Sequence, residues 1–138
     1  MKEETDTLTE DILEMRNRGE VIICMDANAK VGLMGESISR NGQMMMEVFK
    51  ECKLEIMNGK DICKGVVTRQ NRRISSEKLA IDFIVASYEA SLCFHSMIID
   101  ESGDHRIRYN NKNDSDHNTV IASLAMGTKR VAVWRSSI

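Results

Sequence analysis

EVIICM, residues 20–25, is a compact run rich in β-branched side chains and apolar at successive positions. Such a run is typical of a strand buried on both of its faces, inside a sheet that helices or another sheet cover. The strand is expected to end at Asp26, and Asn28 follows two residues later. If the extended conformation continues, both polar side chains project from one face at the carboxyl edge of the sheet, where ligand sites gather in α/β proteins.

Helical and extended patterns follow one another around this strand. The capping box TLTE at residues 7–10 predicts a helix over 8–18, and the apolar stripe that ends at Cys52 predicts a second helix from an N-cap at Asn41 to about Lys53. Further strands are predicted over 54–57, 65–69, 79–86, 94–99 and 118–124, with a hairpin connection at 71–77 and a polar loop at 101–115. The order predicts an α/β (α+β) fold with a mixed β-sheet and helices on one face.

Length and composition suit a single domain. The chain has 138 residues, of which 42% are hydrophobic, and it contains no proline and no polar stretch that reads as a linker. We expect one domain over residues 1–126 and a tail over 127–138. Trp134 in that tail is expected to be either a docking anchor or part of a disordered remnant.

Several classes of protein are disfavoured. No apolar run is long enough to cross a bilayer, and the acidic N-terminus lacks the order of a signal peptide. The four cysteines form no C-x-x-C pair, so we expect reduced structural thiols rather than a zinc or redox site. These features predict an intracellular protein, in the nucleus or the cytoplasm, that has no membrane partner.

The charge is slightly acidic but unevenly distributed. A net charge of −2 argues against binding nucleic acid by bulk charge alone. Residues 61–80 nevertheless carry five basic side chains against two acidic ones. The basic ones are Lys64, Arg69, Arg72, Arg73 and Lys78. This stretch is the candidate surface for a polyanion, although a solvated basic hairpin explains the charge equally well.

A carboxylate lies inside an otherwise apolar strand. Asp82 is set in LAIDFIV, residues 79–85, and removing an ionised carboxylate from water costs several kcal/mol. It must therefore be paired, bound to metal or protonated. Asp116 and His117 close the polar loop just before the last predicted strand. Because a buried carboxylate can fix the tautomer of an imidazole and raise its basicity, we expect Asp82 to pair with His117.

Polar side chains thus gather at several strand ends. Asp26, Asn28, Asp82, Asp116 and His117 together supply three carboxylates, an amide and an imidazole. Carboxylate oxygens suit Mg²⁺, which keeps several waters and bridges phosphate oxygens. The predicted cofactor is Mg²⁺, with Mn²⁺ as an alternative, and such a site lets an acidic protein act on a polyanion.

Three stretches resemble motifs of the endonuclease/exonuclease/phosphatase superfamily. IICMDANA at 22–29 resembles its Gly-Asp-Phe-Asn strand end, LAIDFI at 79–84 its Ile-Asp-Tyr-Ile strand, and SDH at 115–117 matches its Ser-Asp-His motif. Each motif alone is weak, but three in the right order and spacing are specific. The intervening sequence is most similar to the AP-endonuclease-like domains of non-LTR retrotransposons. Met25 stands where the family has glycine and Ala27 where it has an aromatic residue.

The resemblance implies a role for each matching residue. Asp26 would orient or deprotonate the attacking water, and Asn28 would hydrogen-bond the phosphate. His117, oriented by Asp82, would stabilise charge on the phosphorus, and Asp116 would bind metal or position water.

The basic stretch also has a counterpart in the family. Thr68 and Arg69 lie where the family has a segment that contacts phosphate or DNA, and Arg72 and Arg73 follow in the same basic stretch. DNA is accordingly the expected substrate and partner.

The resemblance also implies half of a four-layer α/β-sandwich. The main metal-binding glutamate and another asparagine of the family come from a first half, and this chain is expected to begin after them. Activity would then need a complementing N-terminal half.

Three interpretations of the function remain open. The first is a metal-dependent endonuclease half that acts on DNA. The second is an inactive remnant, such as a homodimer whose second copy covers the exposed sheet face. The third is a phosphoacceptor domain with Asp26 as acceptor, which is disfavoured because a second acidic pair and a suitable lysine are not evident.

Overall fold

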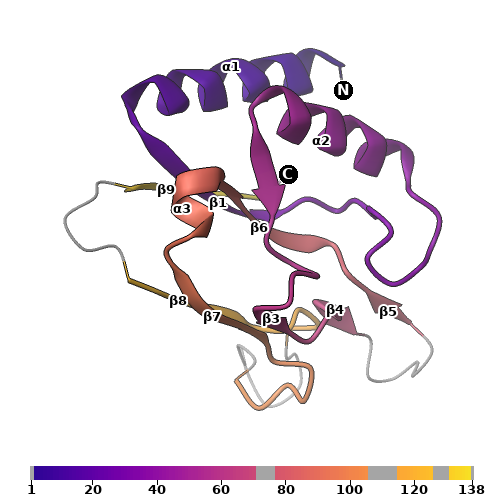
Figure 1. Cartoon of the computed structure of the whole chain (residues 1–138). Helices are drawn as coiled ribbons and strands as arrows, with labels where there is room; N and C mark the ends of the chain where they lie inside the picture. The colour runs from indigo at the N-terminus through magenta and orange to yellow at the C-terminus, as the bar shows by residue number, and fades with distance from the viewer. Residues whose placement is uncertain (1, 71–76, 106–114, 126–130, 138) are drawn as a thin grey trace.

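Two helices cover one face of a four-stranded mixed sheet in the computed structural model, which describes residues 2–70, 77–105, 115–125 and 131–137 (Figure 1). The helices are α1 (Lys2–Arg18) and α2 (Arg40–Glu51). The strands are β1 (Glu20–Asp26), β2 (Leu54–Ile56), β6 (Asp82–Ser87) and β9 (Val131–Ser137), in the order β2-β6-β1-β9. β1 is antiparallel to β6 and parallel to β9. The expected fold class, a mixed sheet with helices on one face, is therefore confirmed.

A second sheet lies on the other side of the first. It contains β3 (Cys63–Lys64), β7 (Phe94–Ile99) and β8 (Val120–Leu124), in the order β3-β7-β8. A short helix, α3 (Tyr88–Ser91), joins β6 to β7. A separate two-stranded ribbon, β4 (Arg69–Gln70) with β5 (Lys78–Leu79), precedes β6. Figure 1 shows the layers in the order helices, four-stranded sheet, three-stranded sheet.

Strand β1 is central because both of its faces are buried. Its odd-numbered side chains, such as Ile23, pack with α1 and α2, whereas Ile22 packs with residues of the second sheet and α3. Ile23 is fully buried and Ile22 nearly so. This two-sided burial is what the apolar run at residues 20–25 predicts.

The helices differ from their predicted bounds mainly at their N-termini, and α2 also ends at Glu51, two residues before the predicted end. α1 begins at Lys2 instead of residue 8, and Glu3 and Glu4 in its first turn interact favourably with the helix dipole. α2 is capped by Ser39 rather than Asn41, because the Ser39 hydroxyl accepts a hydrogen bond from the Gly42 N–H at 3.1 Å. No helix in the described part of the chain is both long and apolar enough to cross a membrane.

Two predicted strands differ from the strands that the structure contains. The strand expected over 65–69 is absent, because Gly65 has a positive φ of 91° and separates β3 from β4. The strand expected over 79–86 is split between β5 and β6, and the break lies at Ala80 and Ile81. The hairpin connection expected at 71–77 lies, except for Glu77, outside the described residues, but its flanks pair as β4 and β5.

The expected tail contains a strand. Residues 131–137 form β9, which pairs along the whole length of β1, from Glu20 opposite Val131 to Asp26 opposite Ser137. Short-range sequence patterns do not reveal this element, because its pairing partner lies more than a hundred residues away. These residues therefore belong to the central sheet.

The loop between β1 and α2 is held closed by two hydrogen bonds between Lys30 and Ser39. The Ser39 N–H donates to the Lys30 carbonyl and the Lys30 N–H donates to the Ser39 hydroxyl, both at 3.0 Å. A Cβ atom at Gly42 would lie 1.9 Å from the same Lys30 carbonyl oxygen. Glycine is thus required where α2 crosses the loop.

Replacing Gly42 with alanine should lower the free energy of unfolding by about 1–3 kcal/mol or more, because the backbone at Lys30 must move to admit the methyl group. Urea denaturation followed by circular dichroism measures the change. Gln43→Ala, at the exposed neighbouring position, should leave stability within about 0.5 kcal/mol. Equal stability of the two variants would contradict the close contact.

Candidate active site

Two carboxylates face each other where β1 ends and β6 begins. Asp26 and Asp82 are direct partners in the antiparallel register, and both are half-buried. The Ala27 N–H donates to the Ile81 carbonyl at 3.0 Å and continues the pairing beyond the strand ends. Strand pairing on both sides of Asp26 and Asp82 therefore holds the two acids next to each other.

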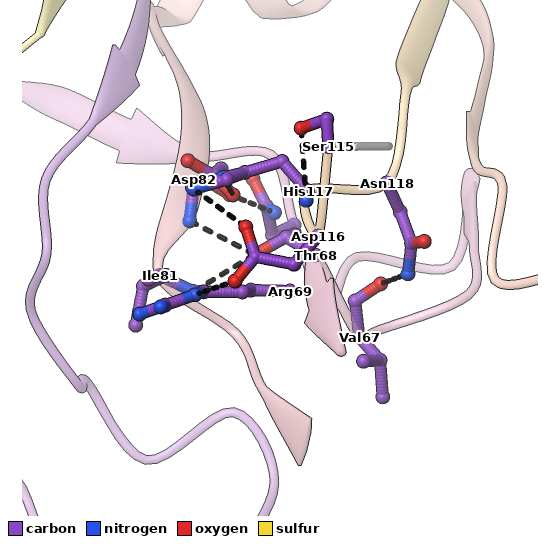
Figure 2. A network of polar contacts seen from close by, with 10 residues as sticks. Val67, Thr68, Arg69, Ile81, Asp82, Ser115, Asp116, His117 and Asn118 are labelled. Carbon is purple, nitrogen blue, oxygen red and sulfur yellow. Dashed lines mark hydrogen bonds and ion pairs between the residues drawn. The ribbon is translucent and has the colours of Figure 1, made fainter. Parts of the chain in front are cut away.

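His117 lies against this pair. Its Nδ1 is 2.8 Å from Asp82 Oδ2, and its backbone N–H donates to the Ser115 hydroxyl (Figure 2). The expected contact between Asp82 and His117 is therefore present. When Asp82 is ionised, Nδ1 is the donor in this hydrogen bond, which leaves Nε2 as the nitrogen free to act on a ligand.

Asp116 is paired with an arginine on β4. Arg69 Nε donates to Asp116 Oδ2 at 2.8 Å, and the Gln70 N–H donates to the Asp116 carbonyl at 2.9 Å. Asp116 Oδ1 is also 3.8 Å from His117 Nε2. Arg69 and Asp116 are each about 40% exposed, at 42% and 43%, so the ion pair borders solvent. The Arg69 guanidinium thus forms an ion pair within the site.

The two aspartates that contact His117 have opposite electrostatic environments. Burial raises the pKa of the Asp82 carboxyl, and the hydrogen bond and charge of His117 only partly oppose this effect. Burial also disfavours ionisation of Asp116, but the hydrogen bond and charge of Arg69 outweigh it, so the pKa of Asp116 is lowered. Asp116 is the more firmly ionised of the two.

Three side chains could hold a metal ion together. One ligand atom from each of Asp26, Asp82 and His117 lies within 4.8 Å of the others. The carboxylates of Asp26 and Asp82 suit Mg²⁺ or Mn²⁺, so these two side chains fit the expected cofactor. Asp116, the residue expected to bind the metal, is not in this group and is paired with Arg69 instead.

Asn28 does not continue the strand. It has a left-handed conformation, with φ at 46°, and it is exposed between two buried alanines. Asn28 was expected on the same face as Asp26 only if the chain stayed extended. The chain is not extended at Asn28, so this placement does not apply. Asparagine tolerates the left-handed region better than most residues, which explains the residue type without a phosphate contact.

Thr68 supports Asp82 from within the core. It is fully buried, and its hydroxyl accepts hydrogen bonds from the Ile81 N–H at 2.9 Å and the Asp82 N–H at 3.0 Å. These bonds replace ladder hydrogen bonds and cause the break between β5 and β6. A side chain buried in this way is unavailable to DNA, so the expected DNA contact is replaced by a positioning role.

Asn58 holds the other side of the same backbone, and no sequence motif marks it as a site residue. It is 4% exposed, its Nδ2 donates to the Asp82 carbonyl, and its Oδ1 accepts from the Ile84 N–H, each at 2.9 Å. At the point where β2 ends, the Asn58 side chain makes the two hydrogen bonds to β6 that a neighbouring strand would otherwise make. The pair Asn58-Gly59 by itself predicts only a turn, and the burial of Asn58 reveals this further role.

A cavity of about 250 Å³ opens beside the two acids. Cys24, Ile84 and Val120 contribute apolar walls, and Asp26 and Asp82 also line the cavity. Arg72 and Arg73, predicted to bind nucleic acid, lie outside the described residues.

The motifs and this geometry agree with the comparison to known families. The sequence profile of a family described as endonuclease-reverse transcriptase matches residues 1–121. The chain belongs to the endonuclease-reverse transcriptase family. The predicted membership of the endonuclease/exonuclease/phosphatase superfamily is thereby confirmed. No curated protein matches the sequence.

Solved structures resemble the fold of this endonuclease-reverse transcriptase family member. A 3′ phosphatase from Neisseria bound to a product DNA hairpin is 17% identical, with a TM-score of 0.62, and the match covers 88% of this chain and 51% of that one. A 3′–5′ exonuclease from Neisseria meningitidis is 20% identical, with a TM-score of 0.61, and the match covers 87% and 51%. At these identities the likeness shows the fold alone. The chain spans about half the length of both structures.

Thr68→Val should lower the free energy of unfolding by about 1–3 kcal/mol, because two buried N–H groups lose their acceptor. Amide hydrogen exchange at Ile81 and Asp82 is the specific measurement. Protection at these two amides should fall in the valine variant and persist in Thr68→Ser, which keeps the hydroxyl. Unchanged protection in Thr68→Val would exclude the positioning role.

The stability of the protein should depend on the ionisation of Asp82. Since its pKa is raised in the folded state, the native protein holds this proton more tightly than the unfolded chain. The stability that the protonated form contributes is present at acidic pH and is lost as pH rises through the raised pKa. Asp82→Asn should therefore gain stability relative to wild type as the pH rises above about 4, the ordinary pKa of an aspartate, as measured by urea denaturation at a series of pH values. A constant difference would contradict this electrostatic account.

Proposed function

We propose that this chain carries catalytic groups of a Mg²⁺-dependent phosphodiester hydrolase that acts on DNA, of the kind found in retrotransposon endonucleases. The observation that carries the proposal is the cluster of Asp26, Asp82 and His117, in which a hydrogen-bonded imidazole lies beside paired carboxylates. Mn²⁺ is the alternative cofactor. The product DNA hairpin bound to the similar Neisseria phosphatase supports DNA as the substrate.

Each residue has a distinct task in hydrolysis. Asp26 orients a water molecule and accepts its proton as the water oxygen bonds to phosphorus and the bond to the leaving oxygen breaks. His117 contributes Nε2 to stabilise the charge on the phosphoryl oxygens, since Nδ1 is occupied by Asp82. A bound divalent cation would be held by the carboxylates of Asp26 and Asp82 and would neutralise phosphate charge.

Arg69 and Asp116 complete the electrostatic surroundings. Their ion pair sets a guanidinium at the solvent border of the site, within the field of the aspartates. Removal of Asp116 would take away the partner of Arg69, so Asp116 orients the Arg69 side chain. Asp116 also places a negative charge 3.8 Å from His117 Nε2. Because Asp116 is paired with Arg69 and lies outside the group that could hold a metal ion, we assign it this positioning role rather than direct metal binding.

This chain matches about half of each of the two solved structures. We propose that full activity uses a complementing N-terminal half that supplies further metal ligands. A second copy of this chain is the alternative partner.

Nicking of supercoiled plasmid and of an abasic duplex in Mg²⁺ tests the catalytic role. Wild type should exceed both Asp26→Ala and His117→Ala by about 10²–10⁴-fold, the usual contribution of a positioned acid or base. EDTA should abolish the difference, and Glu47→Gln on the exposed face of α2 should behave as wild type. If wild type cuts no faster than the two alanine variants, catalysis by this chain alone is rejected.

A further inference from the structure

A second cavity, of about 310 Å³, lies between the loop that follows β1 and strand β5. Lys30, Met34, Gly35 and Glu36 line it from the loop, and Lys78, Leu79 and Ala80 line it from the β5 side. We call it the Lys30–Lys78 cleft. The mechanism described above does not use it.

The cleft is close to the catalytic acids because the same two segments form both. Lys30 is four residues after Asp26, so their Cα atoms are at most about 14 Å apart. Ala80 is two residues before Asp82, which limits that separation to about 7 Å. The hydrogen bond from the Ala27 N–H to the Ile81 carbonyl holds the two segments together between the acids and the cleft.

The two lysines come from opposite walls and are available to a ligand. Both are exposed, and within the described residues no ion pair joins either ammonium group to a carboxylate. Glu36, the acid in the cleft, accepts two hydrogen bonds from N–H groups of its own loop. Glu101, which lies near Lys78, likewise accepts two backbone N–H groups. The side chains that line the cleft are two lysines and one glutamate, so their formal charge is +1, and the Glu36 carboxylate is engaged by its own loop.

The walls between the lysines are apolar. Met34 is 42% exposed, although a side chain of this kind is normally buried, and Leu79 and Ala80 continue the apolar surface toward Asp82. Cationic groups that flank an apolar wall match the alternation of phosphate and deoxyribose along a DNA strand. The loop itself is fixed by the contacts of Lys30 with Ser39 and Gly42, so the cleft is formed before a ligand arrives.

We propose that the Lys30–Lys78 cleft binds the sugar-phosphate backbone of the DNA strand that is cut, within a few nucleotides of the scissile phosphate. The limits of about 7 and 14 Å correspond to a few nucleotides at about 3.4 Å of rise for each. This inference rests on the proposed function. Lys30 and Lys78 contact phosphates, and the apolar wall contacts the intervening sugar.

Salt-dependent DNA binding tests this assignment directly. A fluorescein-labelled duplex is titrated with the full chain in EDTA, where no cleavage occurs, and anisotropy is read at several NaCl concentrations. For Lys30→Ala/Lys78→Ala, the slope of log K against log salt should be shallower by about 2, or about 0.9 for each lost phosphate contact. Affinity at low salt should fall at least about tenfold.

A matched variant removes the same charge elsewhere. Arg18→Ala/Lys50→Ala lowers the net charge equally, at exposed positions on α1 and α2 away from the cleft. It should keep the wild-type slope. Equal slopes for the two double variants would overturn the proposal, as would a wild type that does not bind the duplex. Plasmid nicking is read separately, so a chain that binds through the cleft but does not cut rejects only the proposed catalysis.

Discussion

The register between β1 and β6 sets Asp26 opposite Asp82, and every other part of the site is arranged around this pairing. Two carboxylates at adjacent strand ends repel each other unless a cation or a donor lies between them. His117 supplies the donor on one side. A one-residue shift in the register would turn one carboxylate to the other face of the sheet and would separate the pair.

The site combines rigid backbone with exposed side-chain tips. Thr68 and Asn58 fix the backbone of Asp82 from two directions, and both are buried in the core. By contrast, Arg69 and Asp116 lie at the border with solvent. Burial raises the cost of ionising Asp82, and it also strengthens the hydrogen bond through which that carboxylate orients the imidazole. Destabilising groups of this kind are retained at functional sites because they act on the ligand.

The sequence predicts those parts of the structure that depend on local patterns. The buried strand β1, the fold class and the contact of Asp82 with His117 follow from an apolar run and from the cost of burying a carboxylate. The conformation of Asn28 does not follow, because a single left-handed residue leaves no periodic signal. The roles of Thr68 and Asn58 depend on which distant N–H groups lack a ladder partner. A sequence pattern does not contain this information.

The parallel pairing of β9 with β1 has a consequence for the order in which the protein folds during synthesis. Glu20 and Val131 are 111 positions apart, so β1 gains its second neighbour only after more than a hundred further residues have been synthesised. Until then β1 presents an open edge that can pair with the strand of another nascent chain. Contacts of such long range also form slowly, since closing a large loop precedes the gain from pairing. The central strand of this protein is therefore fully enclosed only once β9, far later in the sequence, has been made.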